Sequence, residues 1–244
     1  YWQQTLVSSS PFINQRREDF GGTGWGQNQL NWVSEIVTGT YQIGTQLDGL
    51  NHLMIGDRFY NGYPAREIIE EWGTNKLGIE TVPPIVTRGI LVDVTEAGGG
   101  EALDKGEVIT VARVEDFLAR HGLAAEKGDA LLFHTGWGRH WAEDPERFSS
   151  GEPGPGMELA RWILAKGIAV AGCDTWSFGA VPSEDPARPF EVPHMLNVKH
   201  GLFILENLAT EELARDGIYE FLFVVTHAKT KGSTAAQVSP AAVV

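Results

Sequence analysis

Short apolar runs alternate with helical patterns along most of the chain. Runs bounded by turn residues predict strands at Thr40–Asp48, Gly89–Val94, Ala130–Thr135, Ile168–Cys173, Leu202–Leu205 and Tyr219–Thr226. Apolar positions at helical spacing predict helices at Ala65–Trp72, Val111–His121, Met157–Lys166 and Ala209–Arg215. Gly122 and Gly167 follow the second and third of these helices as stop signals. Strands interleaved with helices favour an α/β layered fold.

The chain shows no internal repeat and no low-complexity linker, so its 244 residues are predicted to form a single domain over residues 1–244. It opens at Tyr1 rather than at a methionine, without the basic and apolar regions of a signal peptide. We therefore expect that some N-terminal sequence is missing.

The charge balance excludes several classes of partner. The formal net charge is −13 and the sequence pI is about 4.9, which disfavours binding to nucleic acid or to an anionic membrane surface. No apolar run approaches the roughly 18 residues of a membrane span. Cys173 is the only cysteine, so no intrachain disulfide forms, which suits a reducing compartment and predicts a cytoplasmic protein.

One polar row suggests chemistry near the N-terminal third. Gln42, Gln46, Asp48 and His52 lie at even offsets, so an extended chain would present them on one face. Amide, carboxylate and imidazole groups are costly to bury unless each has a partner, and a metal ion with its water would supply partners. The alternative is the solvated face of an edge strand, and the pattern alone leaves both open.

A second suggestive pair is His194 and Glu206, which lie 12 residues apart. Glu206 directly follows an apolar run, so it is either a metal-binding carboxylate or an ordinary charge at a strand end. His194 is either a ligand or an ordinary residue at a helix start. Spacing alone does not bring the pair to Asp48.

The segment from Gln42 to His52 resembles a known signature. Its pattern, Gln42-x-Gly44-Thr45-Gln46-x-Asp48-x-x-x-His52, is similar to that of the metal-dependent cyclase family, which includes bacterial kynurenine formamidase and isatin hydrolase. The spacing of His194 and Glu206 is also similar to the family's second metal-binding pair, and the resemblance runs from about Thr40 to the C-terminus. The resemblance implies a swivelling β/β/α domain, with a compact mixed sheet core and flanking helices.

The chain departs from the usual signature in its metal ligands. Gln42 and Gln46 stand where the family usually has histidines, and Leu50 stands where proline is usual. This glutamine form resembles the trans-dienelactone hydrolase branch of the family. Amide oxygens are poorer donors to zinc than imidazole and suit harder ions such as Mn²⁺. The resemblance therefore implies one Zn²⁺ or Mn²⁺ ion per chain on Asp48, His194 and Glu206, with Gln46 the glutamine nearer to it and the position of Gln42 weak or empty.

Together these features predict a metal-dependent hydrolase that uses a metal-activated water to open a lactone or cyclic amide, or to cleave a small amide or ester. His52 is the expected proton acceptor and donor, and Asp174 or His134 could orient or assist. For Asp174 a turn cap, and for His134 an ordinary core histidine, are equally good interpretations. The alternatives are a metal-dependent lyase, cyclase or isomerase acting on a small carbonyl substrate, and a non-catalytic binding protein. The resemblance also implies a homodimer or homotetramer.

Overall fold

The computed structural model describes residues 3–8, 26–30 and 33–244. These belong to two compact units, Tyr1–Ile43 and Gly44–Val244. In the first unit, β1 (Gln3–Ser8) pairs antiparallel with β2 (Val33–Thr38). The prediction of a single domain over residues 1–244 stays a prediction.

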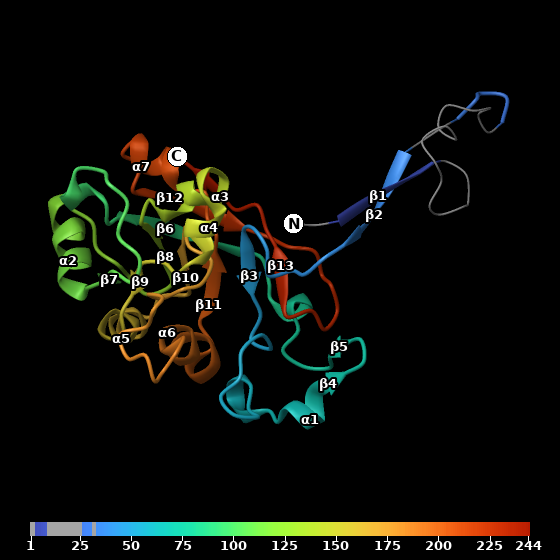
Figure 1. Cartoon of the computed structure of the whole chain (residues 1–244), viewed down its shortest axis with the longest axis horizontal. Coiled ribbons are helices and arrows are strands. Elements are labelled where there is room, and N and C mark those ends of the chain that lie inside the picture. The colour runs from blue at the N-terminus through green and yellow to red at the C-terminus, as the bar shows by residue number, and fades with distance from the viewer. Residues whose placement is uncertain (1–2, 9–25, 31–32) are drawn as a thin grey trace. The chain divides into compact units, whose positions relative to one another are not determined.

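The second unit is built on an eight-stranded mixed sheet in the order β13-β3-β11-β10-β8-β6-β12-β14 (Figure 1). Its four central strands run parallel to one another, and the two outer strands on each side run antiparallel to their inner neighbours. The central strands are β6 (Ile85–Asp93), β8 (Ala130–His134), β10 (Val170–Cys173) and β11 (Phe203–Glu206), and the outer strands are β3 (Gln46–Asp48), β12 (Glu220–Val225), β13 (Ala235–Gln237) and β14 (Ala241–Val243). The α/β fold predicted from the sequence is confirmed, with helices flanking a mixed sheet.

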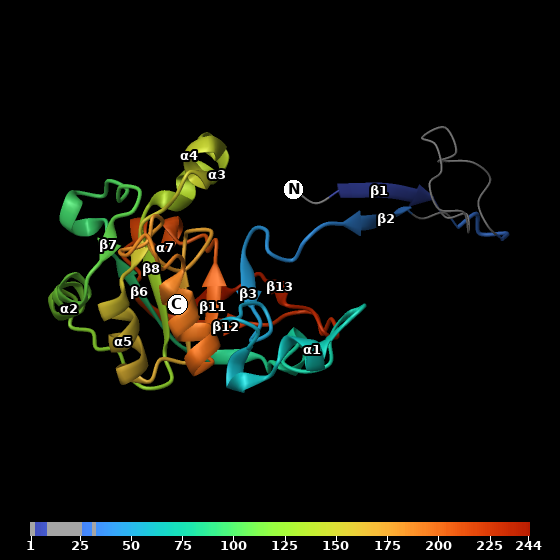
Figure 2. The same ribbon diagram turned by 60° about the horizontal axis from the view of Figure 1, so that its bottom comes forward.

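Two helices cover one face of the sheet. They are α2 (Val111–Arg120) and α5 (Met157–Lys166), which lie on the same side in Figures 1 and 2. Thr110 caps α2 by accepting a hydrogen bond from the Arg113 backbone N–H, and Gly167 ends α5 in the left-handed conformation at φ 71°. Both helices lie within one residue of their predicted bounds.

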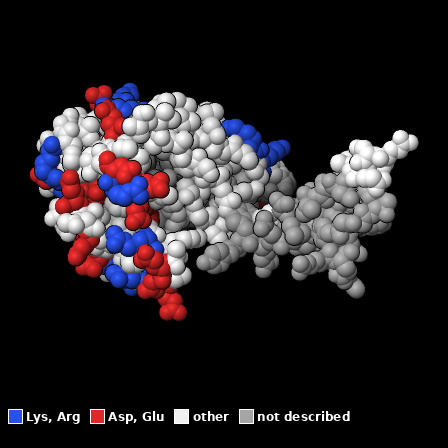
Figure 3. Space-filling model, turned by 90° about the horizontal axis from the view of Figure 1, so that it is seen from above, with Lys and Arg blue, Asp and Glu red and all other residues white. Residues whose placement is uncertain are grey.

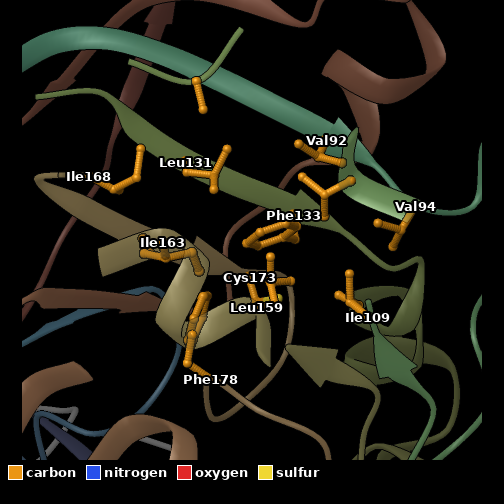
Figure 4. Close-up of a cluster of buried hydrophobic side chains, with 14 of the residues drawn as sticks. Val92, Val94, Ile109, Leu131, Phe133, Leu159, Ile163, Ile168, Cys173 and Phe178 are labelled. Atoms are coloured by element: carbon orange, nitrogen blue, oxygen red, sulfur yellow. The ribbon is translucent and has the colours of Figure 1, made fainter. Parts of the chain in front are cut away.

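Side chains alternate between two buried layers along the central strands. Leu131 and Phe133 of β8 point into the layer under α2 and α5, where they join Ile163, Cys173 and other apolar residues (Figure 4). Ala130 and Leu132 of the same strand enter the layer on the other face. Burial on both faces accounts for the continuous apolar runs of these parallel strands.

Two predicted elements are much shorter in the structure. The predicted helix at residues 65–72 is a single turn, α1 (Ala65–Ile68), followed by a hairpin of β4 (Ile69–Glu70) and β5 (Gly73–Thr74). Gly73, at φ 140°, lies so close to Gly232 that a Cβ atom there would be 2.5 Å from its carbonyl oxygen, and the Thr74 N–H donates to the same carbonyl at 3.0 Å. The hairpin thus packs against a segment 159 residues away along the chain, a contact that the local helical pattern does not reveal.

The predicted strand at residues 40–48 shrinks to β3. Gly44 has a left-handed φ of 67°, which breaks the extended chain before β3 begins. After β3 the chain turns, and the His52 N–H donates to the Gly49 carbonyl at 3.2 Å. Gln46 and Asp48 therefore share one strand, whereas the expectation of one extended face from residue 42 to residue 52 is wrong.

The other elements are short. They are α3 (His140–Glu143), α4 (Pro145–Ser149), α6 (Glu191–Pro193), which continues as a π-helical segment at His194–Lys199, α7 (Glu211–Arg215), the parallel pair β7 (Val108–Ile109) and β9 (Gly154–Pro155), and 3₁₀ turns at Tyr60–Gly62, Ile79–Thr81, Glu96–Gly98 and Trp137–Arg139. Among the described helices none is both long and apolar enough to cross a membrane. Acidic and basic side chains intermingle on the left of the face seen in Figure 3.

Candidate functional site

A pair of buried carboxyl groups bridges β3 and β11. Gln46 lies opposite Glu206 in the antiparallel register of these strands, and Asp48 follows two residues later on the same face of β3. Gln46 Nε2 donates a hydrogen bond of 2.7 Å to Glu206 Oε2, and the carboxyl groups of Asp48 and Glu206 are hydrogen-bonded to each other. The three side chains are nearly inaccessible, with exposed fractions of 2%, 2% and 6%. We call Asp48 and Glu206 the carboxyl pair.

Burial makes ionisation of the carboxyl pair unfavourable. Loss of solvation raises the pKa of Asp48 from 3.8 to about 7, although the hydrogen bonds from Glu206 and Gln46 act in the opposite direction. The pKa of Glu206 is raised well above its ordinary value, first by burial and then by the charge of Asp48. Near neutral pH the pair therefore retains protons that ordinary carboxyl groups would lose.

Two buried oxygen atoms, one in the carboxyl pair and one in the neighbouring Gln46 amide, receive no hydrogen bond within the described part of the chain. They are Asp48 Oδ1 and Gln46 Oε1, and no described residue donates to either atom. Unpaired buried acceptors next to two carboxyl groups are costly, and a bound cation would satisfy both atoms. This donor set of carboxylate and amide oxygens fits a hard divalent ion.

The described residues contain no group of three His, Cys, Asp or Glu side chains that is arranged to hold a metal ion. His194 begins the π-helical segment, and burial and the charge of Lys199 lower its pKa, whereas Glu191 raises it. His194 thus stays a predicted third ligand. Gln42 belongs to the Tyr1–Ile43 unit, where its Oε1 accepts a hydrogen bond of 2.8 Å from Thr40 Oγ1, and its role also stays a prediction.

His52 follows β3 by four residues and is partly buried. Burial lowers the pKa of its imidazole below the ordinary 6.5. The imidazole is consequently neutral at physiological pH, which is the state that a proton acceptor requires.

The other two predicted catalytic residues lie at the carboxyl ends of β8 and β10. The Asp174 carboxylate accepts hydrogen bonds from Thr135 N at 3.0 Å, Thr135 Oγ1 at 2.6 Å and Gly136 N at 2.9 Å. His134 Nδ1 lies 2.7 Å from Thr210 Oγ1 and 3.5 Å from Asp174 Oδ2. Asp174 thus caps the turn at Thr135 and Gly136, as one of its two interpretations predicts, and His134 is a hydrogen-bonded buried histidine.

His134 and Asp174 line a cavity of about 300 Å³, whereas Asp48 and Glu206 do not contribute to its lining. The structure therefore divides the predicted site residues of the Gly44–Val244 unit. Gln46, Asp48 and Glu206 come together between β3 and β11, and His134 and Asp174 come together at the cavity.

Glu152 is a buried acid near Glu206 that the sequence analysis did not identify. Glu152 is fully buried and accepts hydrogen bonds from Trp176 N at 2.8 Å, Ser177 N at 3.1 Å and Ser177 Oγ at 2.7 Å. Burial raises the pKa of Glu152 well above its ordinary value, and its charge also raises that of Glu206. Glu152 lies in the segment Ser-Gly-Glu-Pro-Gly, whose composition is typical of a solvated loop, so no local signal identifies it.

Comparison with known proteins identifies relatives along most of the chain. A family model described as "Putative cyclase" matches residues 3–180. No protein of curated function matches the sequence.

Solved structures with a similar fold include a novel cyclase, which has a TM-score of 0.84 and 28% identity over 100% of this chain and 80% of its own. An isatin hydrolase bound to the product analogue thioisatinate has a TM-score of 0.64 and 16% identity over 97% of this chain and 91% of its own. A potential metal-dependent hydrolase with cyclase activity has a TM-score of 0.55 and 14% identity over 98% of this chain and 85% of its own. The last two similarities are evidence of a common fold.

Proposed function

Because the chain belongs to the cyclase family, we propose that it is a metal-dependent hydrolase that opens a lactone or cyclic amide, or cleaves a small amide or ester. The observation that carries this proposal is the carboxyl pair, with Asp48 Oδ1 and Gln46 Oε1 buried beside it without donors. A protein gains no stability from such an arrangement unless a cation compensates it. The isatin hydrolase and metal-dependent hydrolase among the structural neighbours support the same class of reaction.

Asp48 and Glu206 would hold one divalent ion, with Gln46 supplying its Oε1 and His194 completing the ligand set. The bond from Gln46 Nε2 to Glu206 Oε2 turns the Gln46 amide so that its oxygen faces away from that carboxylate oxygen. When bound, the ion supplies a Lewis acid that polarises a substrate carbonyl and lowers the pKa of a coordinated water. The oxygen-rich donor set favours Mn²⁺ over Zn²⁺.

His52 is proposed as the proton acceptor. Its imidazole is held neutral by burial, so it can take a proton at physiological pH and return it to the leaving group. The hydrogen bonds of Asp174 and His134 join β8, β10 and the start of α7. These two residues therefore hold the loops around them in place and do not contact the carboxyl pair.

The glutamines at residues 42 and 46 favour lactone hydrolysis within this class. They reproduce the pattern that resembles the trans-dienelactone hydrolase branch, in which glutamine replaces both usual histidines. We therefore place lactones first and cyclic amides second among the substrates to be tested.

The test combines metal content with hydrolysis. Chelator-treated protein is reloaded with Mn²⁺ or Zn²⁺, metal per chain is measured, and hydrolysis of a lactone series and of isatin is followed in ¹⁸O water. We expect about one ion per chain, metal-dependent turnover and label in the new carboxylate. Asp48→Ala should lose both ion and turnover, whereas Asp116→Ala, which removes an exposed ion pair with Arg120, should retain both. Failure to bind either ion, or turnover without incorporation of label, contradicts the proposal.

A further inference from the structure

A cavity of about 300 Å³ opens at the carboxyl ends of the parallel strands, and nothing in the proposed reaction uses it. His134 ends β8, Asp174 follows β10 and Asn207 follows β11, and all three line the cavity. In α/β proteins, ligands bind in the crevice outside the carboxyl ends of the parallel strands. Its volume is at the lower end of the range for small-molecule sites, about 300–1,000 Å³.

The lining holds one arginine, Arg139, and two acidic side chains, Asp174 and Glu211. Arg139 lines the cavity and is half-buried, and within residues 33–244 its guanidinium forms no ion pair. Burial has the largest effect in lowering the pKa of the neighbouring His140, followed by the charges of Arg147 and then Arg139, whereas Asp144 and Glu143 raise it. A half-buried guanidinium without a direct ion pair can bind an anion through its free N–H groups.

Two acidic residues also line the cavity, and neither competes for Arg139. The Asp174 carboxylate is occupied by the backbone N–H groups of Thr135 and Gly136 and by the Thr135 hydroxyl. Glu211 is exposed to solvent in the first turn of α7. Both acids therefore leave the guanidinium available to a ligand.

Arg139 is held in place before any ligand arrives. Its Nε donates a hydrogen bond of 2.9 Å to the Gly136 carbonyl, and Gly136 is itself fixed by Asp174. One edge of the guanidinium is thus used for positioning, and its Nη groups remain to bind a carboxylate. A preorganised donor costs less entropy on binding than a free side chain.

Another part of the cavity wall is aromatic and apolar. Trp141 and Phe148 line the cavity and pack edge to face, with ring centroids 5.3 Å apart and planes at 90°. Leu208 and Ala209 add to the apolar lining. This wall suits a flat ring rather than a hydrated inorganic ion.

We propose that the cavity is a second binding site, separate from the carboxyl pair, for a small planar organic carboxylate. Arg139 binds the carboxylate, and Trp141 and Phe148 cover the ring. The site does not depend on the proposed hydrolysis, because none of these residues belongs to the carboxyl pair.

Calorimetric titration of the purified, chelator-treated full chain with 3-hydroxybenzoate tests the site. We expect saturable binding that weakens at least about 10-fold in Arg139→Gln and at least about 10-fold for the neutral analogue 3-hydroxybenzamide. Arg161→Gln, which changes an exposed arginine of α5, should bind as the unchanged protein does. The comparison of the two ligands uses the unchanged protein, so it remains decisive if Arg139→Gln folds poorly.

Three results would overturn the proposal: no binding at millimolar 3-hydroxybenzoate, equal affinity for the acid and the amide, or loss of binding in Asp48→Asn. The last result would assign the ligand to the carboxyl pair. The titration is done on metal-free protein, so its result does not depend on whether the protein is a metal-dependent hydrolase. Likewise, absence of ligand binding at the cavity would not contradict the proposed hydrolysis.

Discussion

The molecule buries two pairs of acidic side chains in opposite ways. Asp174 and Glu152 lie in loops after β10 and before β9, and each accepts at least three hydrogen bonds from backbone and hydroxyl donors. Asp48 and Glu206 lie on adjacent strands and face each other. Gln46 Nε2 donates a hydrogen bond to Glu206 Oε2, whereas no described residue donates to Asp48 Oδ1. The first pair is satisfied by the fold itself, whereas the second needs something that the fold does not provide. Incomplete satisfaction, rather than burial, therefore distinguishes the candidate reactive site.

The largest expected effect comes from breaking the satisfied pair. Asp174→Ala removes the acceptor for Thr135 N, Thr135 Oγ1 and Gly136 N and leaves buried donors unpaired. We expect the free energy of unfolding to fall by about 3–5 kcal/mol, measured by urea denaturation. Asp116→Ala, at an exposed ion pair, is the control and should change it by less than about 1 kcal/mol. A loss at Asp174 no larger than at Asp116 would remove the contrast between the two pairs.

The unsatisfied pair should make metal-free protein less stable as the pH rises. The pKa of Asp48 is about 7 in the folded protein against 3.8 in the unfolded chain, so between pH 4 and pH 7 the unfolded chain loses its proton first. We expect the free energy of unfolding of chelator-treated protein to fall by on the order of 2–3 kcal/mol from pH 5 to pH 8. Added Mn²⁺ should reduce this fall, since the ion replaces the proton. Stability that stays level or rises over this range in metal-free protein would show that the pair is already compensated.

Removing the charge of one member should stabilise the metal-free protein. Asp48→Asn eliminates a buried ionisable group whose charged form folding disfavours. At pH 8 we expect a gain on the order of 1–3 kcal/mol in the free energy of unfolding, the opposite sign to Asp174→Ala. The same variant should lose metal-dependent stabilisation, as measured by thermal unfolding with and without Mn²⁺. If Asp48→Asn destabilises the metal-free protein, the pair contributes to folding as Asp174 does.

The smallest expected effect concerns Glu152. Ser177→Ala removes one of its donors, a hydroxyl at 2.7 Å, and leaves the two backbone donors in place. We expect a loss of about 1–2 kcal/mol by urea denaturation. Ser149→Ala is the matched control, because that hydroxyl is exposed and donates to the Pro145 carbonyl. If both variants lose the same free energy of unfolding, burial does not strengthen the hydrogen bond between Ser177 and Glu152.

Elements determined by nearby residues were predictable from the sequence. The helices at 111–120 and 157–166 have a buried stripe at helical spacing and a glycine one or two residues beyond their last residue, and both signals are local. The central strands were predicted to within two residues at most ends, except for β6, which begins four residues before the predicted run. The pattern at 65–72 is equally helical, but the hairpin that follows the single helical turn packs against Gly232, which no local window contains.

The candidate site was predictable only in part for the same reason. The family signature identified Gln46, Asp48 and Glu206, and the register of β3 and β11 brings them together. The donors to Glu152 lie 24 and 25 residues away from it in sequence, so only the folded chain reveals that its carboxyl group is buried and hydrogen-bonded. Arg139 is one of many arginines in the sequence, and its lack of an ion pair among the described residues becomes visible only in three dimensions.

Glu206 and Asn207 are consecutive residues, yet one belongs to the carboxyl pair and the other lines the cavity. Inserting or deleting a single residue between 203 and 207 would move each side chain to the place of its neighbour and empty both sites together. Variation in natural relatives should accordingly change the identity of residues in this segment while keeping its length constant.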